Sequence, residues 1–225
     1  MDSLFNNMPI DEFLSPIWLS LKIASIAGLV AIIFGTLMGR FMARKSFKGK
    51  AIVETIMMLP MVLPPTVIGF FLIIIFGKNG IGGQLIEYIF SQSIMFTWYA
   101  AALASSIVAF PLMYQSAKAG FQGVDLNIED AARVDGASEG KVFFLISVPL
   151  ASKALISGSI LSFARALGEF GATLMFAGNI PGRTQTLPTA IYIAIDSGNM
   201  TLAWAWVISI VTISFIMLLA IRSKE

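Results

Sequence analysis

Long apolar runs constrain the fold of this chain more than any other feature of its sequence. Hydrophobic residues make up 57% of the 225 residues and charged residues only 12%, and the mean hydropathy is +0.84. Several runs reach the roughly 20 residues that a helix needs to cross about 30 Å of hydrocarbon. We therefore predict an all-α integral membrane protein that forms one helical bundle.

The positions of these runs predict five membrane spans. The spans are expected at residues 17–39, 51–76, 94–117, 142–164 and 201–221, between an extracytoplasmic segment (1–16) and a cytoplasmic tail (222–225). The apolar runs between residues 166 and 198 are too short to cross alone, so we expect re-entrant or short helices there. A sixth crossing in that region is the alternative.

Prolines interrupt the second span. Pro60, Pro64 and Pro65 each lack a backbone donor, and the Pro64–Pro65 pair predicts a break or a kink. Unpaired backbone in a membrane must be covered by protein or face a wet cavity, so the break marks either the transport pathway or a plain kink. The glycine-rich stretch 77–83 predicts a flexible loop, because it lacks the Gly-Lys-Ser/Thr ending of a phosphate-binding loop.

Lysine and arginine residues predict how the spans are oriented. With the N-terminus outside, the cytoplasmic side receives most of the basic residues, in the loop 40–50, the segment 124–141 and the tail. The outside then receives only Lys78 and Arg183, with Arg165 near the boundary. We therefore expect a multi-pass protein of a bacterial-type cell membrane, with its C-terminus and the segment 124–141 in the cytoplasm.

The absence of cysteine and histidine limits the chemistry of the chain. Without thiolate or imidazole groups, the common metal ligands, thiol nucleophiles and histidine acid–base pairs are missing. We expect no catalytic residue, no bound cofactor or metal, and no nucleic-acid partner. An intramembrane hydrolase would need a serine or aspartate constellation on facing spans, and none can be assembled.

A polar stretch at residues 127–140 separates the third and fourth spans. Asn127 is expected to cap a helix that begins at the next residue, with Glu129 and Asp130 beside the positive end of the helix dipole. Gly136 stands where a left-handed residue ends a helix. The small residues between them give the helix a smooth side, which suits either a groove in another protein or packing on the bundle.

This stretch resembles the EAA motif of ABC importer permeases, E-A-A-x-x-x-G-x9-I-x-L-P. The matching residues are Asp130, Ala131, Ala132, Gly136, Ile146, Val148 and Pro149. Asp130 replaces the glutamate of the motif, with Glu129 one position earlier, and Val148 replaces the leucine. The resemblance covers the chain from the first span to the last, and it implies the type I importer fold, with the 127–140 helix docking in a cytosolic ATPase.

The same resemblance implies the partners of the chain. These are a second copy of the permease, a pair of ATPase subunits that bind ATP and Mg²⁺, and an extracytoplasmic binding protein for an oxyanion. Residues 162–173 and 178–188 are similar to the molybdate branch of these permeases, whereas sulfate permeases tend to carry Gly-Glu-Tyr-Gly at residues 168–171. Molybdate is therefore the expected substrate, with tungstate and sulfate or thiosulfate as alternatives.

Two charged residues follow the fourth span. Arg165 and Glu169 stand four positions apart and would pair on a continuing helix. Arg165 either attracts an oxyanion near the outer mouth or, as the favoured interpretation, forms a structural ion pair with Glu169.

A transporter driven by an ion gradient is the second hypothesis for function. Such carriers place carboxylates within their spans. Glu54 and Glu169 are the few candidates here, and their scarcity argues against a gradient-driven carrier.

Overall fold

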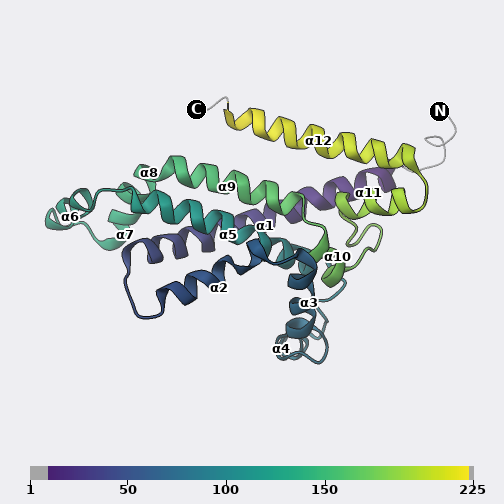
Figure 1. Ribbon diagram of the computed structural model, residues 1–225, viewed down its shortest axis with the longest axis horizontal. Coiled ribbons are helices and arrows are strands. Elements are labelled where there is room, and N and C mark those ends of the chain that lie inside the picture. Colours follow the sequence, from purple (N-terminus) through teal and green to yellow (C-terminus); the bar gives the residue numbers. More distant parts are fainter. Residues whose placement is uncertain (1–9, 223–225) are drawn as a thin grey trace. The chain divides into compact units, whose positions relative to one another are not determined.

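The computed structural model describes residues 10–222 of the chain, with side chains through residue 219, and this part is helical throughout (Figure 1). The helices are α1 (Ile10–Arg44), α2 (Lys50–Val62), α3 (Pro65–Phe76), α4 (Ile81–Phe90), α5 (Trp98–Gln122), α6 (Leu126–Val134), α7 (Glu139–Val142), the π-helix η1 (Phe143–Ser147), α8 (Val148–Leu150), α9 (Ser152–Leu167), α10 (Gly171–Ala177), α11 (Leu187–Asp196) and α12 (Met200–Arg222). Among them, α1, α5 and α12 are long and apolar enough to cross a membrane. Two bent pairs, α2 with α3 and α7–α8 with α9, raise that number to as many as five.

The helices form two compact units. One unit contains residues up to Ser25, Pro64–Ser105 and the chain from Leu167 onward, and the other contains Ile26–Leu63 and Ser106–Ala166. The long helices α1 and α5 each contribute to both units.

In the first unit, α11 and α12 pack against the beginning of α1. Their buried core includes Leu187, Ala190 and Trp206. Trp206 stacks on Phe13 with ring centroids 6.3 Å apart, and its indole nitrogen donates to the Phe13 carbonyl at 3.1 Å. Ser20 accepts a hydrogen bond of 2.7 Å from the amide of Leu187, the first residue of α11. These contacts attach α11 and α12 to the first part of α1.

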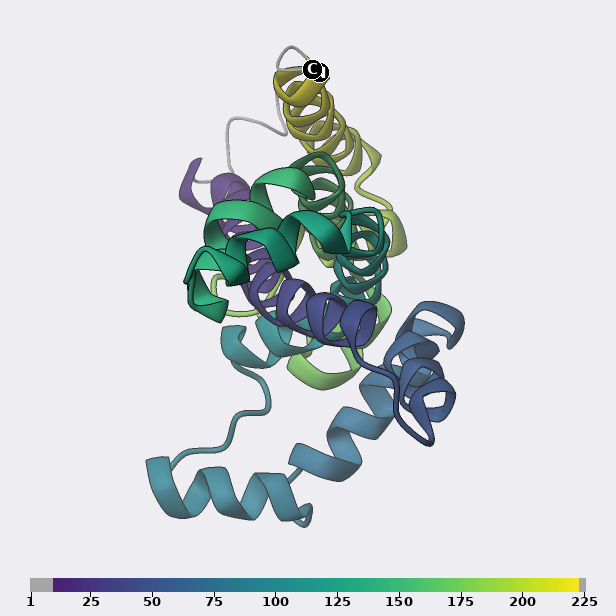
Figure 2. The same cartoon turned by 90° about the vertical axis from the view of Figure 1, so that its left-hand side faces the viewer.

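In the second unit, small residues let α1, α5 and α9 approach closely. A Cβ added at Gly39 of α1 would lie 2.7 Å from the Cβ of Ala117 on α5. Likewise, a Cβ at Gly158 of α9 would lie 2.6 Å from the Cβ of Ser116. Such close packing of small faces is typical of helices in membranes, where no hydrophobic effect drives helix against helix. Figure 2 shows this unit from the side of α6.

The structure confirms the proline break and changes several boundaries. Helix α2 ends at Val62 and α3 begins at Pro65, whose missing amide costs nothing in the first turn of a helix. Helix α4 begins at Ile81, inside the stretch expected to be a loop. The expected span 142–164 is bent by 77° at Ala151, between α8 and α9. Between residues 166 and 198 the helices α10 and α11 are short, as expected.

Candidate functional site

Helix α6 is a short helix with defined caps at both ends. Asp125 caps its beginning, because its Oδ1 accepts a hydrogen bond of 2.9 Å from the amide of Asn127. The expectation that Asn127 itself is the cap was therefore wrong by two residues. At the other end, Gly136 has φ +87°, and the amide of Ala137 donates to the carbonyl of Ala132 at 2.9 Å. This is a Schellman ending with glycine at the left-handed position.

The polar stretch 127–140 contains two helices. Helix α6 ends at Val134, and α7 begins at Glu139 after the turn at Gly136. Ser138 occupies the cap position of α7, but its side chain makes no capping hydrogen bond.

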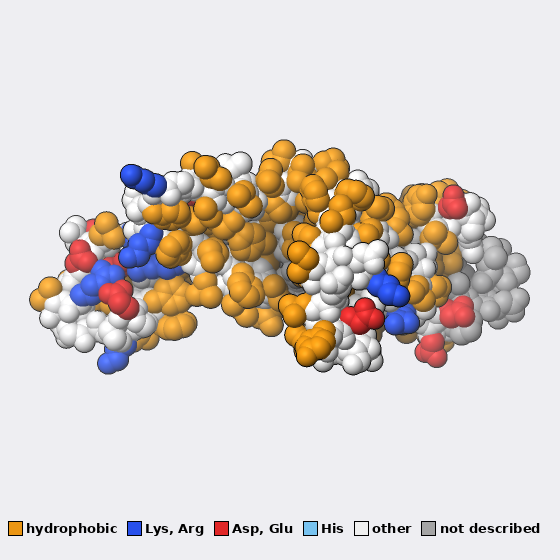
Figure 3. Space-filling model, turned by 90° about the horizontal axis from the view of Figure 1, so that it is seen from below, with side chains coloured by type: hydrophobic (Ala, Val, Ile, Leu, Met, Phe, Trp, Pro, Cys, Tyr) orange, Lys and Arg blue, Asp and Glu red, His pale blue; other side chains and the backbone are white. Residues whose placement is uncertain are grey.

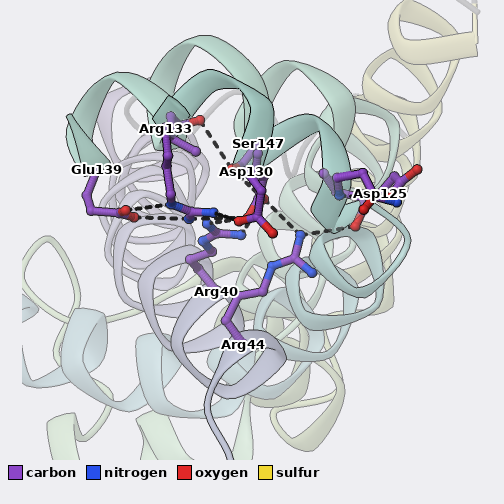
Figure 4. A network of polar contacts seen from close by, with 11 residues as sticks. Arg40, Arg44, Asp125, Asp130, Arg133, Glu139 and Ser147 are labelled. Carbon is purple, nitrogen blue, oxygen red and sulfur yellow. Dashed lines mark hydrogen bonds and ion pairs between the residues drawn. The ribbon is translucent and has the colours of Figure 1, made fainter. Parts of the chain in front are cut away.

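Glu129 fixes α6 to the end of α1. Its carboxylate is buried, with 1% of the side chain exposed, and it accepts two hydrogen bonds from Arg40, at 2.7 and 3.0 Å. Arg44 donates to the same carboxylate at 2.8 Å, and Ser147 of η1 donates to it at 2.8 Å. Figure 4 shows both arginines extending from α1 toward α6. One carboxylate thus joins three segments that are distant in the sequence. We call Arg40, Arg44, Glu129 and Ser147 the anchor cluster.

The anchor cluster keeps Glu129 ionised. Burial alone would raise the pKa of Glu129, but hydrogen bonds from Arg40, Arg44 and Ser147 outweigh it and lower the pKa from 4.5 to about 2. Arg44 also donates to the carbonyl of Val124 at 3.1 Å, just before the cap of α6. The cluster therefore fixes both the helix and the chain that leads into it.

A second group of charges lies at the surface beside the anchor cluster. Arg133 donates to Asp130 at 2.6 Å and to Glu139 of α7 at 2.6 Å, as the dashed lines of Figure 4 show. An open pocket of about 630 Å³ is lined by Arg133, Glu139 and the anchor residues of α1 and α6, among others. Figure 3 shows basic and acidic side chains close together at the left of the view.

The surface of α6 that faces away from Glu129 is small and accessible. Ala131 is exposed, and Val134 is 87% exposed one turn along from it. Ala132 is half-buried, so the smooth side expected from both alanines is presented mainly by Ala131. The charged part of that surface is Asp130, whose side chain is 67% exposed. A partner that contacts α6 would meet these residues first.

The second half of the motif lies in the bent segment after α7. Ile146 is half-buried in η1, and Pro149 is exposed in α8. Between them, Ser147 is fully buried and reaches Glu129. The structure thus brings Glu129 and the segment 146–149 together.

The remaining predicted residues lie elsewhere in the fold. Helix α9 ends at Leu167, so Arg165 and Glu169 do not share a continuing helix. Glu169 is buried, and its Oε1 accepts a hydrogen bond of 2.8 Å from the amide of Ala172 at the beginning of α10. Pro60 lies inside α2, while Pro64 and Pro65 form the break before α3. Among residues 10–222, no three acidic side chains come together in a group that could hold a metal ion.

Arg40, Arg44 and Ser147 were missed as site residues by the sequence reasoning. The two arginines are four positions apart at the end of the first span, a spacing that places both on one helix face. That spacing is a usable signal for an anionic partner, but nothing in the sequence identifies Glu129, 89 positions away, as that partner.

Comparison with protein families gives a match to one family model. The model described as "Binding-protein-dependent transport system inner membrane component" matches residues 31–223. A protein of Bacillus subtilis (strain 168) named "Putative molybdenum transport system permease protein YvgM" is 63% identical over 225 residues, covering 100% of this chain and 99% of YvgM. The molybdenum transport system permease protein ModB of Escherichia coli (strain K12) is 42% identical over 179 residues, covering 80% of this chain and 78% of ModB.

Comparison with solved structures agrees on the fold. A chain of the MetNI methionine ABC transporter in inward-facing conformations gives a TM-score of 0.72 at 15% identity, covering 100% of this chain and 97% of that chain. A chain of the bacterial alginate ABC transporter, in complex with alginate pentasaccharide-bound periplasmic protein, gives 0.77 at 16% identity, covering 98% and 81%. The expected all-α importer fold is confirmed.

Proposed function

The chain belongs to the family of binding-protein-dependent transport system inner membrane components, and from this premise we propose that it is the permease subunit of an ATP-driven molybdate importer. It is a multi-pass membrane component and not an enzyme, and ATP is bound by a partner subunit. The 63% identity to YvgM over the whole chain is the observation that carries the substrate assignment. Tungstate and sulfate or thiosulfate are the alternatives within the same class.

Reconstitution tests the substrate and the energy source together. The permease is placed in proteoliposomes with its partner ATPase and binding protein, and uptake of radiolabelled molybdate is followed with and without ATP. ATP-dependent uptake that excess sulfate does not compete away is the expected result. Uptake that prefers sulfate would contradict the substrate assignment but leave the transporter class intact.

Helix α6 is the coupling element in this proposal. Its exposed side, Asp130, Ala131 and Val134, offers a low surface to a groove of the ATPase, while Glu129 on the opposite side is fixed to α1. Because the caps and the anchor cluster hold both ends of α6, a displacement of α6 by the ATPase is passed on to α1 as a whole. ATP binding would thus bias the permease between two global states through a distinct site.

The proline break between α2 and α3 is the proposed helix break near the pathway, because unpaired backbone at membrane depth is tolerated where it lines a cavity. Arg165 stands as either a pathway residue or part of a structural ion pair with Glu169. The capping bond from Glu169 to α10 supports the structural role for the glutamate.

A second copy of the chain completes the proposed pathway, with the N-terminus outside and the loop 40–50 inside. The distribution of lysine and arginine supports this orientation. Because the chain has no cysteine, single cysteines at Ser46 and Asn79 test it directly; both positions are exposed. An impermeant maleimide should label intact cells at position 79 only, and labelling at position 46 would reverse the orientation.

A gradient-driven carrier is the competing function. Glu54 of α2, a candidate proton carrier, accepts a hydrogen bond of 2.6 Å from Lys118 of α5. This ion pair supports a packing role for Glu54 between α2 and α5. Uptake by the purified permease alone under an ion gradient would favour this carrier over the importer.

A further inference from the structure

Helix α4 has an apolar surface that no part of the described chain covers. Ile81 is 89% exposed and Tyr88 is 87% exposed, and Leu85 and Ile89 are exposed between and beside them. At 100° per residue these four residues form one stripe along the helix. The proposed transport function assigns no role to this stripe.

The opposite side of α4 lies directly on the end of α3. Gly83 is buried, and a Cβ added there would collide with the carbonyls of Gly77 and Phe76. A Cβ at Gly80 would collide with the carbonyls of Ile74 and Ile75. These glycines therefore bring the backbone of α4 onto the last turn of α3, and they set which side of α4 faces away from the protein. That side is the apolar stripe.

The charges around α4 place it at the edge of the hydrocarbon. No charged residue occurs between Glu54 and Lys78, and α4 begins three residues after Lys78. A lysine directly after an apolar span marks the membrane–water boundary. The side chains that flank the stripe on one side, Gln84 and Glu87, are polar and exposed. The helix is thus amphipathic and begins at the level of the lipid headgroups.

The exposed surface of the neighbouring helix α3 is apolar, like the stripe. That helix is apolar throughout, and it exposes Phe70, Phe71, Ile74 and Ile75. In a membrane component of this family, such a surface contacts either lipid or a second copy of the chain. A tyrosine at the end of the stripe, Tyr88, is the residue type that collects at the headgroup level, because its ring is apolar and its hydroxyl is polar.

We propose that α4 is an interfacial helix, with the stripe Ile81, Leu85, Tyr88 and Ile89 inserted into the bilayer at the boundary of headgroups and acyl chains. Helices of this kind bury their apolar face about 5–10 Å into that boundary. The glycine contacts then attach this lipid-bound helix rigidly to α3, directly after the proline break. The inference rests on the membrane location of the family and not on the identity of the substrate.

Spin labels test the proposal in the intact importer. Because the chain has no cysteine, Tyr88→Cys and Glu87→Cys each carry one label on the permease, provided that the partner subunits are also cysteine-free. The complex is placed in nanodiscs of phosphatidylglycerol and phosphatidylcholine, and collisions with oxygen and with a water-soluble nickel chelate are measured. Both positions are exposed, and as adjacent residues of a helix they point about 100° apart, so a difference between them reports which side of α4 faces lipid.

The label at position 88 should collide often with oxygen and rarely with nickel, at a depth of about 5–10 Å below the phosphates, and the label at position 87 should show the reverse. Leu85→Cys should behave like Tyr88→Cys, which guards against a local effect of one substitution. Frequent nickel collisions at both 88 and 85 would overturn the proposal.

Shielding from both reagents, with spin–spin broadening that disappears when labelled and unlabelled subunits are mixed, would identify a second copy as the occupant and also overturn it. Molybdate uptake by the same labelled complexes is recorded separately. A result that contradicts the molybdate assignment can therefore be told apart from a result that contradicts the interfacial location of α4.

Discussion

Replacing Glu129 by glutamine should release α6 from α1 while leaving the bundle assembled. Glutamine has the same shape but no charge, and its amide group would point a donor at an arginine that also donates. Arg40, Arg44 and Ser147 would then lose the anion that now accepts four hydrogen bonds from them. The substitution tests whether this one carboxylate holds the coupling element in place.

Two arguments give similar values for the stabilisation free energy that Glu129→Gln removes. A carboxyl pKa lowered from 4.5 to about 2 corresponds to about 3 kcal/mol of stabilisation at 1.36 kcal/mol per tenfold change. Removing one partner of a buried ion pair costs roughly 3–5 kcal/mol. The arginine side chains keep 16% and 17% exposure, so water compensates part of the loss and the lower value applies. About 3 kcal/mol is more than a hundredfold in the equilibrium between docked and released α6.

Hydrogen exchange of the α6 amides measures this equilibrium directly. In Glu129→Gln the amides of α6 should exchange roughly a hundredfold faster, in line with about 3 kcal/mol, and ATP-dependent uptake should fall with normal yield of the membrane protein. The matched control is Asp130→Asn, the adjacent carboxylate, which is exposed and contacts only Arg133 at the surface. The stabilisation free energy lost in Asp130→Asn should be below about 1 kcal/mol. Equal exchange rates in Glu129→Gln and the unchanged protein would refute the anchor.

The pH dependence follows from the same pKa. Because the folded pKa of Glu129 is lowered, its stabilisation is fully present above the ordinary value of 4.5 and is lost as the pH falls toward about 2. After correction for intrinsic exchange, protection of α6 should therefore be constant from pH 7 to pH 5. A loss of protection within that range would show that another group controls α6.

Three further substitutions test the surfaces around α6 and within its unit. Ala131→Trp should weaken co-purification of the ATPase by roughly tenfold or more, since overpacking an interface costs about 1–3 kcal/mol. The control Ser46→Trp, in an exposed loop, should leave co-purification unchanged. Equal recovery of the ATPase with both variants would contradict the docking assignment. Gly136→Ala should destabilise the end of α6 by roughly 1 kcal/mol through strain alone, because φ is +87° and an added Cβ meets nothing within 4 Å. An added Cβ at Gly140 also meets nothing within 4 Å, but Gly140 does not have a left-handed φ. Hydrogen exchange of the α6 amides should therefore become faster in Gly136→Ala and stay unchanged in Gly140→Ala. Gly39→Leu should lower the thermal stability of the detergent-solubilised protein, because its Cβ would lie 2.7 Å from Ala117.

Features that depend on local chemistry were predictable from the sequence. The break before Pro65 follows from the missing amide of proline, and the left-handed Gly136 follows from the ending that a short helix needs. The family resemblance likewise depends on residues close together in the sequence, and the comparisons confirm it.

Features that depend on distant residues were not predictable. Asp130 matched the motif position, yet the buried carboxylate is Glu129, because only Glu129 points toward Arg40 and Arg44 of α1. The bend at Ala151 was also missed, although Pro149 lies two residues before it and lacks a backbone donor; the π-helix that precedes the bend has no signal in the sequence pattern used. Helix α4 was missed because its glycines indicate a loop until their contact with the end of α3 is known.

The anchor cluster also determines what can be exchanged between related transporters. Its carboxylate and its arginines are 85 and 89 positions apart in the chain, so a graft of the segment 124–149 alone would separate Glu129 from the groups that neutralise it. A chimaera that takes this segment from another permease should be active only if the residues at positions 40 and 44 are taken from that permease as well. The transferable part of this protein is therefore a discontinuous set of positions, with two expected membrane spans between them in the sequence.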